Sequence, residues 1–314
     1  MRATVAGAPV SFGVFELTPE GADTLSPDEI LETLAETGYA GVDLGPLGFL
    51  GTGGELRDRL RRFGMPLAGG WVQLPFSDDA AFAAALPELD AALAVFTEAA
   101  LLAEELGAAT GGAAPALLPK PTLADSGSAQ RAARPGLGAG GLDAAGWDRL
   151  ARNLETADAR VRAAGLEPTF HHHAGTFVES PEEIDRLLER VPVGLTLDTG
   201  HLLLGGGDPL VAVERWGSRI NHLHLKDVDA VELGRVTAAG GGMVDVWSSG
   251  AFTAFGRGDI DLAAVMNAIE AAGYEGWVVV EQDVLPAPDT PLAEFHARRA
   301  ADHLQNREAL RAWC

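Results

Sequence analysis

Short apolar runs alternate with helix-type patterns along the whole sequence, and this alternation constrains the fold more than any other feature. The strand-like runs are residues 4–13, 40–45, 66–74, 168–173, 193–199, 220–226 and 276–283, with a weaker one at 107–118. Helix-like patterns lie between them at 26–38, 53–64, 78–107, 146–165, 180–191, 208–217 and 259–273, and a last one follows Pro291. A repeated strand–helix order predicts a parallel sheet covered by helices. Eight such units in 314 residues favour a closed (β/α)8 TIM barrel, one α/β domain over residues 1–314, rather than an open doubly wound sheet.

Two of the expected helices begin with a clear start signal. "SPDE" at 26 and "SPEE" at 180 each place a serine before a proline, with acidic residues in the first helical turn. Serine is a good N-cap, proline suits the first helical position, and acidic groups favour the positive end of the helix dipole. These positions therefore predict two helix N-termini.

Two long segments, 112–146 and 229–258, lack a strong pattern and are rich in glycine. Long connections of this kind in α/β barrels are usually functional. We expect both to be long loops at the C-terminal face of the barrel, where they would form a lid over its mouth.

The charge balance excludes several classes of function. A net charge of −22 would repel phosphate backbones and anionic membranes, so we expect neither a nucleic acid nor a membrane as partner. The apolar stretch 91–109 is interrupted by glutamates, which indicates an amphipathic helix rather than a membrane span. A single cysteine, Cys314, and no signal-like N-terminus predict a cytoplasmic protein. No glycine-rich phosphate loop precedes a helix, which disfavours nucleotide cofactors.

Polar side chains end the last four strand-like runs. His171, Asp198, His224 and Glu281 each follow an apolar run. Taken singly, each has an ordinary structural explanation, such as a turn-capping aspartate or a hydrogen-bonded histidine like His222. Together they would meet at the C-terminal end of a barrel, where buried charges need partners or a metal.

The set predicts one divalent metal ion bound by His171, Asp198, His224 and Glu281. It offers nitrogen and oxygen ligands without a thiolate. That ligand chemistry favours Mn²⁺ or Co²⁺ and also admits Mg²⁺, Fe²⁺ or Zn²⁺. In "FHHHAG", side chains alternate along the strand, so His171 and His173 would face the mouth while His172 would be structural.

At these residues the sequence resembles the xylose isomerase-like TIM-barrel superfamily of sugar phosphate isomerases and epimerases, and within it the inosose (2-keto-myo-inositol) dehydratases. The stretches that carry the resemblance are "AGAPVSFGVFE", "GPLGFL", "AGGWVQLPF", "FHHHAGTFVESPEEIDRLL", "LTLDTGHLLLGGGDP", "HLHLKD", "FTAFGRGDIDL" and "VVVEQD". The resemblance implies a single divalent metal, with Asp198, His224 and Glu281 on the family's ligand positions. His171 stands where many epimerases have a glutamate, which disfavours a two-base epimerase. The strong acidity disfavours the DNA-repair endonuclease branch.

These features predict a metal-dependent carbon–oxygen lyase that acts on a keto-cyclitol or keto-sugar. It would remove an α-proton through a metal-stabilised enolate and eliminate water. Three alternatives stay open: a ketose epimerase or isomerase, an enzyme that β-eliminates from a 3-keto-glycoside, and a sugar-binding protein without turnover. The sequence does not identify an interface, although a homo-oligomer is expected from the resemblance.

Other residues are candidates for contact with the substrate. His173, His201 and Lys226 are the candidate acids and bases, and Glu16, Trp71 and Arg257 are the candidate substrate-binding residues. Each has a simpler alternative. Lys226 could be a surface lysine paired with Asp227, His201 a capping residue, Trp71 a packing residue and Arg257 a turn residue.

Overall fold

Eight parallel strands form a closed barrel in the computed structural model, which describes residues 4–18, 23–109, 116–287 and 289–313. Around the barrel the strands follow the order β1–β10–β7–β6–β5–β4–β3–β2. They span β1 Thr4–Gly7, β2 Gly41–Asp43, β3 Leu67–Leu74, β4 Lys120–Asp125, β5 Thr169–His171, β6 Gly194–Asp198, β7 Ile220–Leu225 and β10 Trp277–Val280. The predicted (β/α)8 barrel is confirmed.

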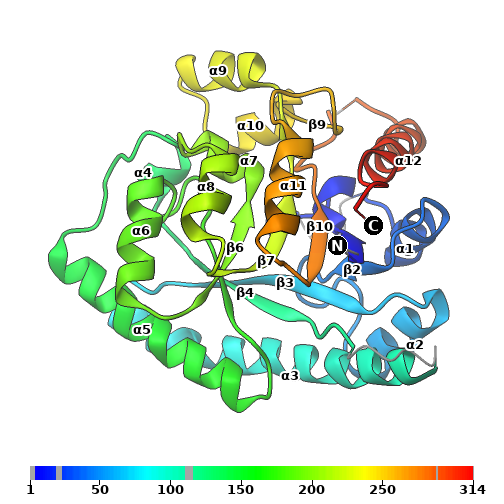
Figure 1. Ribbon diagram of the computed structural model, residues 1–314, viewed down its shortest axis with the longest axis horizontal. Coiled ribbons are helices and arrows are strands. Elements are labelled where there is room, and N and C mark those ends of the chain that lie inside the picture. The colour runs from blue at the N-terminus through cyan, green and yellow to red at the C-terminus, as the bar shows by residue number, and fades with distance from the viewer. Residues whose placement is uncertain (1–3, 19–22, 110–115, 288, 314) are drawn as a thin grey trace.

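Helices surround the barrel on its outside (Figure 1). The longer ones are α1 Pro27–Glu36, α2 Gly53–Phe63, α3 Asp79–Ala109, α5 Ala144–Ala163, α6 Pro181–Arg190, α8 Pro209–Trp216, α9 Ala230–Ala238, α11 Leu262–Ala271 and α12 Leu292–Ala309. Short elements are η1 Pro9–Phe12, α4 Ala129–Ala132, α7 Thr199–Leu204, α10 Met243–Ser249 and the antiparallel pair β8 Asp227–Val228 and β9 Phe252–Thr253. Ser26 and Ser180 cap α1 and α6 in complete capping boxes, as predicted.

The barrel strands bury both faces. In β10, Val278 and Val280 pack in the layer between strands and helices, whereas Trp277 and Val279 belong to a separate cluster inside the barrel. Apolar side chains thus fill part of the interior, and polar side chains already appear at the level of Val279, which is paired with His224. His222, two residues earlier on β7, is buried as well.

The fourth strand lies later than the sequence pattern indicated. β4 covers Lys120–Asp125, inside the segment 112–146 that was expected to be a loop, and α4 and the start of α5 lie there too. The weak candidate at 107–118 holds the end of α3, and its residues 110–115 lie outside the described residues. The reason is the composition of β4, "KPTLAD", whose small and polar residues do not form an apolar run.

The segment 229–258 is also more ordered than predicted. It contains α9, α10 and β9, and it lies above the barrel end (Figure 1). Leu233, Val236, Met243 and Val246 belong there to a second apolar cluster that also includes residues outside the segment, among them Ala174 and Leu204. Each helix is too short to show a clear period, and glycines 240–242 interrupt the pattern between them.

Helix α3 is long and apolar enough to cross a membrane by length and composition alone. Leu89, Leu93 and Phe96 of α3 pack in the main core of the barrel. Core helices of similar composition pass the same test.

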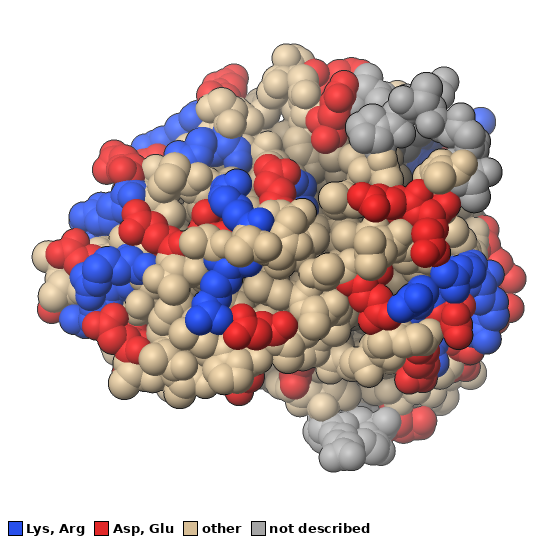
Figure 2. Space-filling view, turned by 90° about the horizontal axis from the view of Figure 1, so that it is seen from below, with Lys and Arg blue, Asp and Glu red and all other residues tan. Residues whose placement is uncertain are grey.

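The surface seen from below in Figure 2 carries Lys and Arg interspersed with Asp and Glu. Cross-helix pairs include Arg61 with Glu105 at 2.8 Å and Arg160 with Asp90 at 2.7 Å.

His303 on α12 makes the stability of the barrel dependent on pH. Its ring is buried, stacks on Phe12 with centroids 4.7 Å apart, and contacts the Tyr39 hydroxyl at 3.0 Å. Burial, with a smaller contribution from Arg299, lowers the pKa of His303 to about 3. In the unfolded chain the pKa is about 6.5. Neutral His303 is therefore favoured by the fold, and its contribution is complete above pH 6.5 and lost as the pH falls toward 3.

We predict that His303→Gln flattens this acid-side loss of stability. As the pH falls, the free energy of unfolding should decrease in both proteins, but less steeply in the variant. The difference between the two slopes should be about 1.4 kcal/mol per pH unit. Urea unfolding at pH 7, 6, 5 and 4 measures both slopes. Equal slopes would contradict the assignment.

Candidate metal centre

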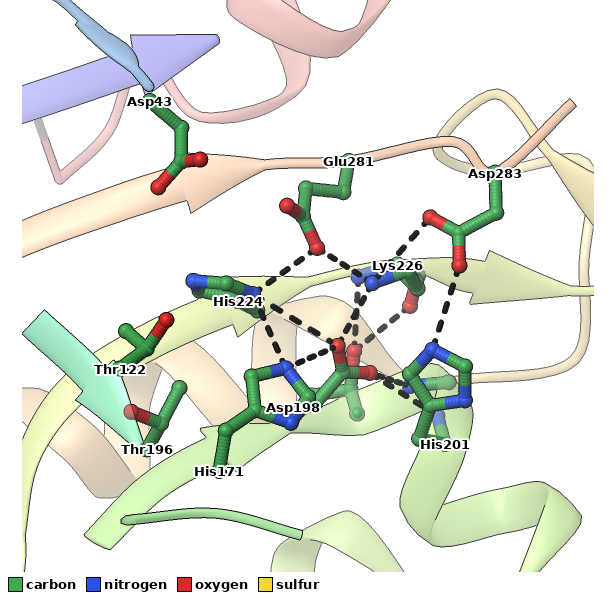
Figure 3. A network of polar contacts seen from close by, with 12 residues as sticks. Asp43, Thr122, His171, Thr196, Asp198, His201, His224, Lys226, Glu281 and Asp283 are labelled. Atoms are coloured by element: carbon green, nitrogen blue, oxygen red, sulfur yellow. Dashed lines mark hydrogen bonds and ion pairs between the residues drawn. The ribbon is translucent and has the colours of Figure 1, made fainter. Parts of the chain in front are cut away.

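Alternation along four strands brings the predicted ligands together. His171 ends β5, Asp198 ends β6, His224 lies near the end of β7, and Glu281 directly follows β10. Asp198 is paired in register with His224, and Val279, two residues before Glu281, is paired with the same histidine. Neighbouring parallel strands therefore present these four side chains at the same end of the barrel (Figure 3).

Donor atoms of the other three predicted ligands lie around Nδ1 of His224. Nδ1 of His224 lies 2.9 Å from Oε2 of Glu281, 3.2 Å from Nε2 of His171 and 3.8 Å from Oδ2 of Asp198. The His171 and Asp198 atoms are 3.4 Å apart. Ligands about 2.1 Å from a tetrahedral ion would be separated by about 3.4 Å. His171, Asp198 and His224 therefore form a group that could hold a divalent metal ion, and Glu281, the fourth predicted ligand, lies against His224.

A lysine ammonium lies among the same carboxylates. Nζ of Lys226 is 2.6 Å from Oδ2 of Asp198 and 3.3 Å from Oδ1 of Asp283, and it also donates to Oε2 of Glu281. Burial alone would lower the pKa of Lys226, but the three carboxylates outweigh it and raise that pKa well above its usual value. Lys226 is buried and charged, so the alternative of a surface lysine is wrong. Asp227 instead accepts hydrogen bonds from the backbone of Gly256 and Gly258.

The ligand carboxylates are held ionised. Burial would raise the pKa of Asp198, but the Lys226 ammonium holds it well below its usual value. In the same way His224 and Lys226 lower the pKa of Glu281 against the effect of burial. The Glu281 carboxylate in turn raises the pKa of His224, although burial opposes this. The site is therefore built for positive charge.

The turn after β6 fixes the Asp198 carboxylate. Its Oδ1 accepts hydrogen bonds from the backbone of Gly200 at 3.0 Å and His201 at 2.9 Å, which caps α7. A Cβ at Gly200 would lie 2.7 Å from Cβ of Lys226, so only glycine allows this close approach. The other oxygen, Oδ2, faces His171 and the Lys226 ammonium.

A cavity of about 370 Å³ opens above the centre. His173, His201 and Asp283 line it, together with His171, His224, Lys226 and Glu281. The rings of His173 and His201 lie 3.6 Å apart between centroids, and Nε2 of His201 lies 3.2 Å from Oδ2 of Asp283. Burial lowers the pKa of both histidines well below the usual value and raises that of Asp283 to about 7. Neutral imidazoles therefore face the cavity.

The model of the xylose isomerase-like TIM barrel family matches residues 28–307 of this sequence. The chain belongs to that family. The match includes all four predicted ligands and every barrel strand except β1, which confirms the family resemblance.

Within the xylose isomerase-like family, the chain is similar to curated proteins named inosose dehydratase. A protein of Geobacillus kaustophilus (strain HTA426) named inosose dehydratase is 31% identical over 319 residues, which cover 95% of this chain and 94% of that protein. A protein of the same name from Lacticaseibacillus casei is 39% identical over 148 residues, 46% of this chain and 50% of that one. The chain thus spans about half the length of several of the curated relatives it matches.

A solved structure shares the fold at low sequence identity. It is described as the IOLI protein with a binding zinc atom, and it is 14% identical with a TM-score of 0.65. The match covers 98% of this chain and 96% of that chain. At this identity the likeness supports the barrel architecture of the family.

Two aspartates of the site were not singled out from the sequence. Asp283 lies two residues after Glu281 and therefore on the same side of the strand, the same spacing that relates Lys226 to His224. Asp43 ends β2 and lines the cavity, and burial raises its pKa to about 7. Asp43 is also a carboxylate at a strand end, so the rule that found Asp198 would have found it.

The predicted substrate-binding residues divide into two groups. Glu16 and Trp71 line the cavity, and the Trp71 ring makes edge contacts with His171 and His173 at centroid distances of 5.2 and 5.0 Å. Arg257 does not line it. Its guanidinium bonds to Asp302 at 3.1 Å on α12, so the expectation that it reaches the substrate from a lid is corrected. Its turn packs against α12 rather than over the barrel mouth.

The cavity wall opposite β10 is pinned by a buried ion pair. Arg131 on α4 bonds to Glu179 at 2.7 Å, and both side chains are fully buried. Glu179 also accepts hydrogen bonds from the backbone of Gly136, Gly138 and Gly175. The β4–α5 connection is therefore fastened to the turn after β5, next to His173.

The adjacent histidines His171 and His172 allow a matched test of the strand register. His171 faces the centre, whereas Nε2 of His172 accepts a hydrogen bond from the backbone N–H of Asp198 at 3.2 Å. We predict that His171→Gln weakens metal binding on the order of 100-fold or more. His172→Gln should leave metal affinity nearly unchanged and cost about 1 kcal/mol of stability. Calorimetric metal titration and urea unfolding measure the two effects, and the opposite ranking would contradict the register.

Proposed function

We propose that the protein is a divalent-metal-dependent lyase that dehydrates a keto-cyclitol or keto-sugar, as in inosose dehydratases. This proposal rests on the close approach of four donor side chains below the cavity, those of His171, Asp198, His224 and Glu281. The names of the curated relatives support it. A divalent ion held there would act as a Lewis acid on a substrate carbonyl and acidify the neighbouring C–H.

His173 is suited to accept the α-proton. Its Nδ1 lies 2.7 Å from the carbonyl oxygen of Ala174, which can only accept a hydrogen bond. Nδ1 therefore carries the proton, and the neutral ring keeps a lone pair on Nε2. Because burial lowers the pKa of His173, the ring stays in this accepting form at neutral pH.

Lys226 and the His201–Asp283 pair are suited to the departing hydroxyl. As the α C–H electrons form the double bond, the β C–O bond breaks and the oxygen needs a proton to leave as water. Asp283, whose pKa is raised to about 7, lines the cavity beside His201 and can supply it. The Lys226 ammonium lines the same cavity and can stabilise the negative charge that develops on oxygen. The walls formed by α10 would keep bulk water from protonating the enolate.

An apolar upper wall favours a second candidate, β-elimination from a 3-keto-glycoside. Val10, Phe15, Met243 and Trp247 line the cavity away from the metal centre, with the Phe15 and Trp247 rings 4.9 Å apart between centroids. An apolar group leaving in place of hydroxide would fit beside these side chains. A ketose epimerase is less favoured, because a histidine stands at position 171.

Product analysis separates these functions. Protein loaded with Mn²⁺ or Co²⁺ should convert an inosose to a product with a new conjugated-ketone absorbance and a mass lower by one water. Release of an aglycone from a 3-keto-glycoside would select the second candidate, and a stereoisomer of unchanged mass would select an epimerase. If inosose binds to the loaded protein but its α-proton never exchanges with solvent, the enzymatic proposal fails.

A further inference from the structure

Beside the metal centre, three buried side chains have polar atoms without a protein hydrogen-bond partner in the described chain. These atoms are Oδ2 of Asp43, both ring nitrogens of His222 and Nε2 of His224. The residues are 5%, 0% and 4% exposed, and one donor atom from each lies within 4.8 Å of the others. Buried polar groups almost always have partners, so this arrangement calls for a bound molecule between them.

His224 has a chemical need for such a partner. Its Nδ1 faces the metal centre, so metal binding requires the lone pair on that nitrogen. The neutral ring then carries its proton on Nε2, on the opposite edge. Histidines that bind metals nearly always donate this second N–H to a carboxylate, a carbonyl or a water. Asp43 lies on the side of His224 away from Lys226, where it can accept (Figure 3).

The surroundings hold Asp43 and His222 in place. Oδ1 of Asp43 accepts a hydrogen bond from the backbone of Gly45 at 3.2 Å, which leaves Oδ2 free to face inward. His222 lies two residues before His224 on β7 and so shares its side of the strand. A Cβ at Gly69 would lie 2.9 Å from Nε2 of His222, so the glycine makes room for that ring.

We propose that Asp43 and His222 hold one water molecule against Nε2 of His224 and act as positioning residues for this metal ligand. The water accepts the Nε2–H of His224 and donates its two protons to Asp43 and to a ring nitrogen of His222. Three hydrogen bonds are the usual number for a buried water. The network fixes the proton on Nε2 and keeps Nδ1 open toward the metal. This inference rests on the proposed metal-dependent function.

Asp43→Asn tests the network, and Asp125→Asn is its matched control. Asn has one acceptor oxygen, so it cannot serve both Gly45 and the water. Asp125 is also a buried aspartate at a strand end, with Oδ1 bonded to the backbone of Gly127 at 2.7 Å and Oδ2 without a protein partner. It has no part in the cluster around His224. Both substitutions therefore make the same local change to a buried aspartate. Only Asp43→Asn alters a residue of the cluster around His224.

Metal titration of the chelator-treated full chain is the main measurement. The Kd for Mn²⁺ should rise about 10- to 100-fold in Asp43→Asn and stay unchanged in Asp125→Asn. His222→Phe, which removes another partner of the water, should also raise it. In Zn²⁺-loaded protein, the proton NMR signal of the His224 Nε2–H should shift in Asp43→Asn and keep its position in the control.

Several outcomes would overturn the inference. A wild-type Kd in Asp43→Asn is one, and an equal rise in Asp125→Asn is another, since it would indicate general loosening. Binding of two metal equivalents by the wild type and one by Asp43→Asn would place a cation, not water, between these residues. If the wild type binds no metal, the proposed function fails as well; a failure confined to the variants leaves it standing.

Discussion

Glu281→Gln is expected to remove both the bound metal and the activity while leaving the barrel folded. Glutamine keeps the size of the side chain but replaces the anionic oxygen that lies 2.9 Å from Nδ1 of His224. It also removes an acceptor of the Lys226 ammonium. Because Lewis-acid stabilisation contributes several kcal/mol to a transition state, turnover should fall roughly 10³-fold or more.

Elemental analysis and the dehydration assay measure this prediction, with circular dichroism to confirm the fold. Glu232→Gln is the control, since this carboxylate pairs with Arg235 on the surface of α9. It should keep metal and turnover at wild-type levels. A Glu281→Gln protein that retains stoichiometric metal and full turnover would remove Glu281 from the centre.

Lys226→Met is expected to destabilise the metal-free protein strongly and the metal-loaded protein much less. Without metal, the Lys226 ammonium is the cation that lies among Asp198, Glu281 and Asp283. Its loss leaves these buried carboxylates uncompensated, and breaking a buried ion pair in this way costs about 3–5 kcal/mol. A divalent ion bound by Asp198 and Glu281 would restore positive charge to the same carboxylates.

Urea unfolding with and without Mn²⁺ measures the two effects. The control is Arg160→Met, which breaks the exposed pair with Asp90 and should cost less than about 1 kcal/mol in both conditions. Equal stability of wild type and Lys226→Met in the presence of a chelator would show that the ammonium does not balance these charges. A loss that Mn²⁺ leaves unchanged would contradict the shared site.

The candidate ligands could be found from the sequence because each depends on local alternation within one strand. His171 ends β5, and the alternation continues just beyond it, so that His171 and His173 line the cavity and His172 does not. The same reasoning carries Lys226 with His224. It applies equally to Asp283, two residues after Glu281, so the sequence pattern contains the signal for Asp283 as well.

Other features depend on contacts that local patterns do not encode. β4 has no apolar run that would mark it in the sequence. It is a strand because it pairs with β3 and β5 in the barrel. Leu233 and Met243 of the segment 229–258 are buried in a cluster with Leu204 of α7, from another part of the chain. Arg257 points to Asp302 because α12 lies beside its turn.

The sequence by itself determined the barrel, the ends of its last four strands and which histidines share a side, because hydrophobic periodicity and side-chain alternation act over a few residues. Only the tertiary structure decided that Lys226 is buried among three carboxylates and that Asp43 lies beside His224. Those relations depend on barrel closure, which brings β2, β7 and β10 together from distant parts of the chain. The charges that set the chemistry of the cavity therefore meet through the fold rather than through the sequence order.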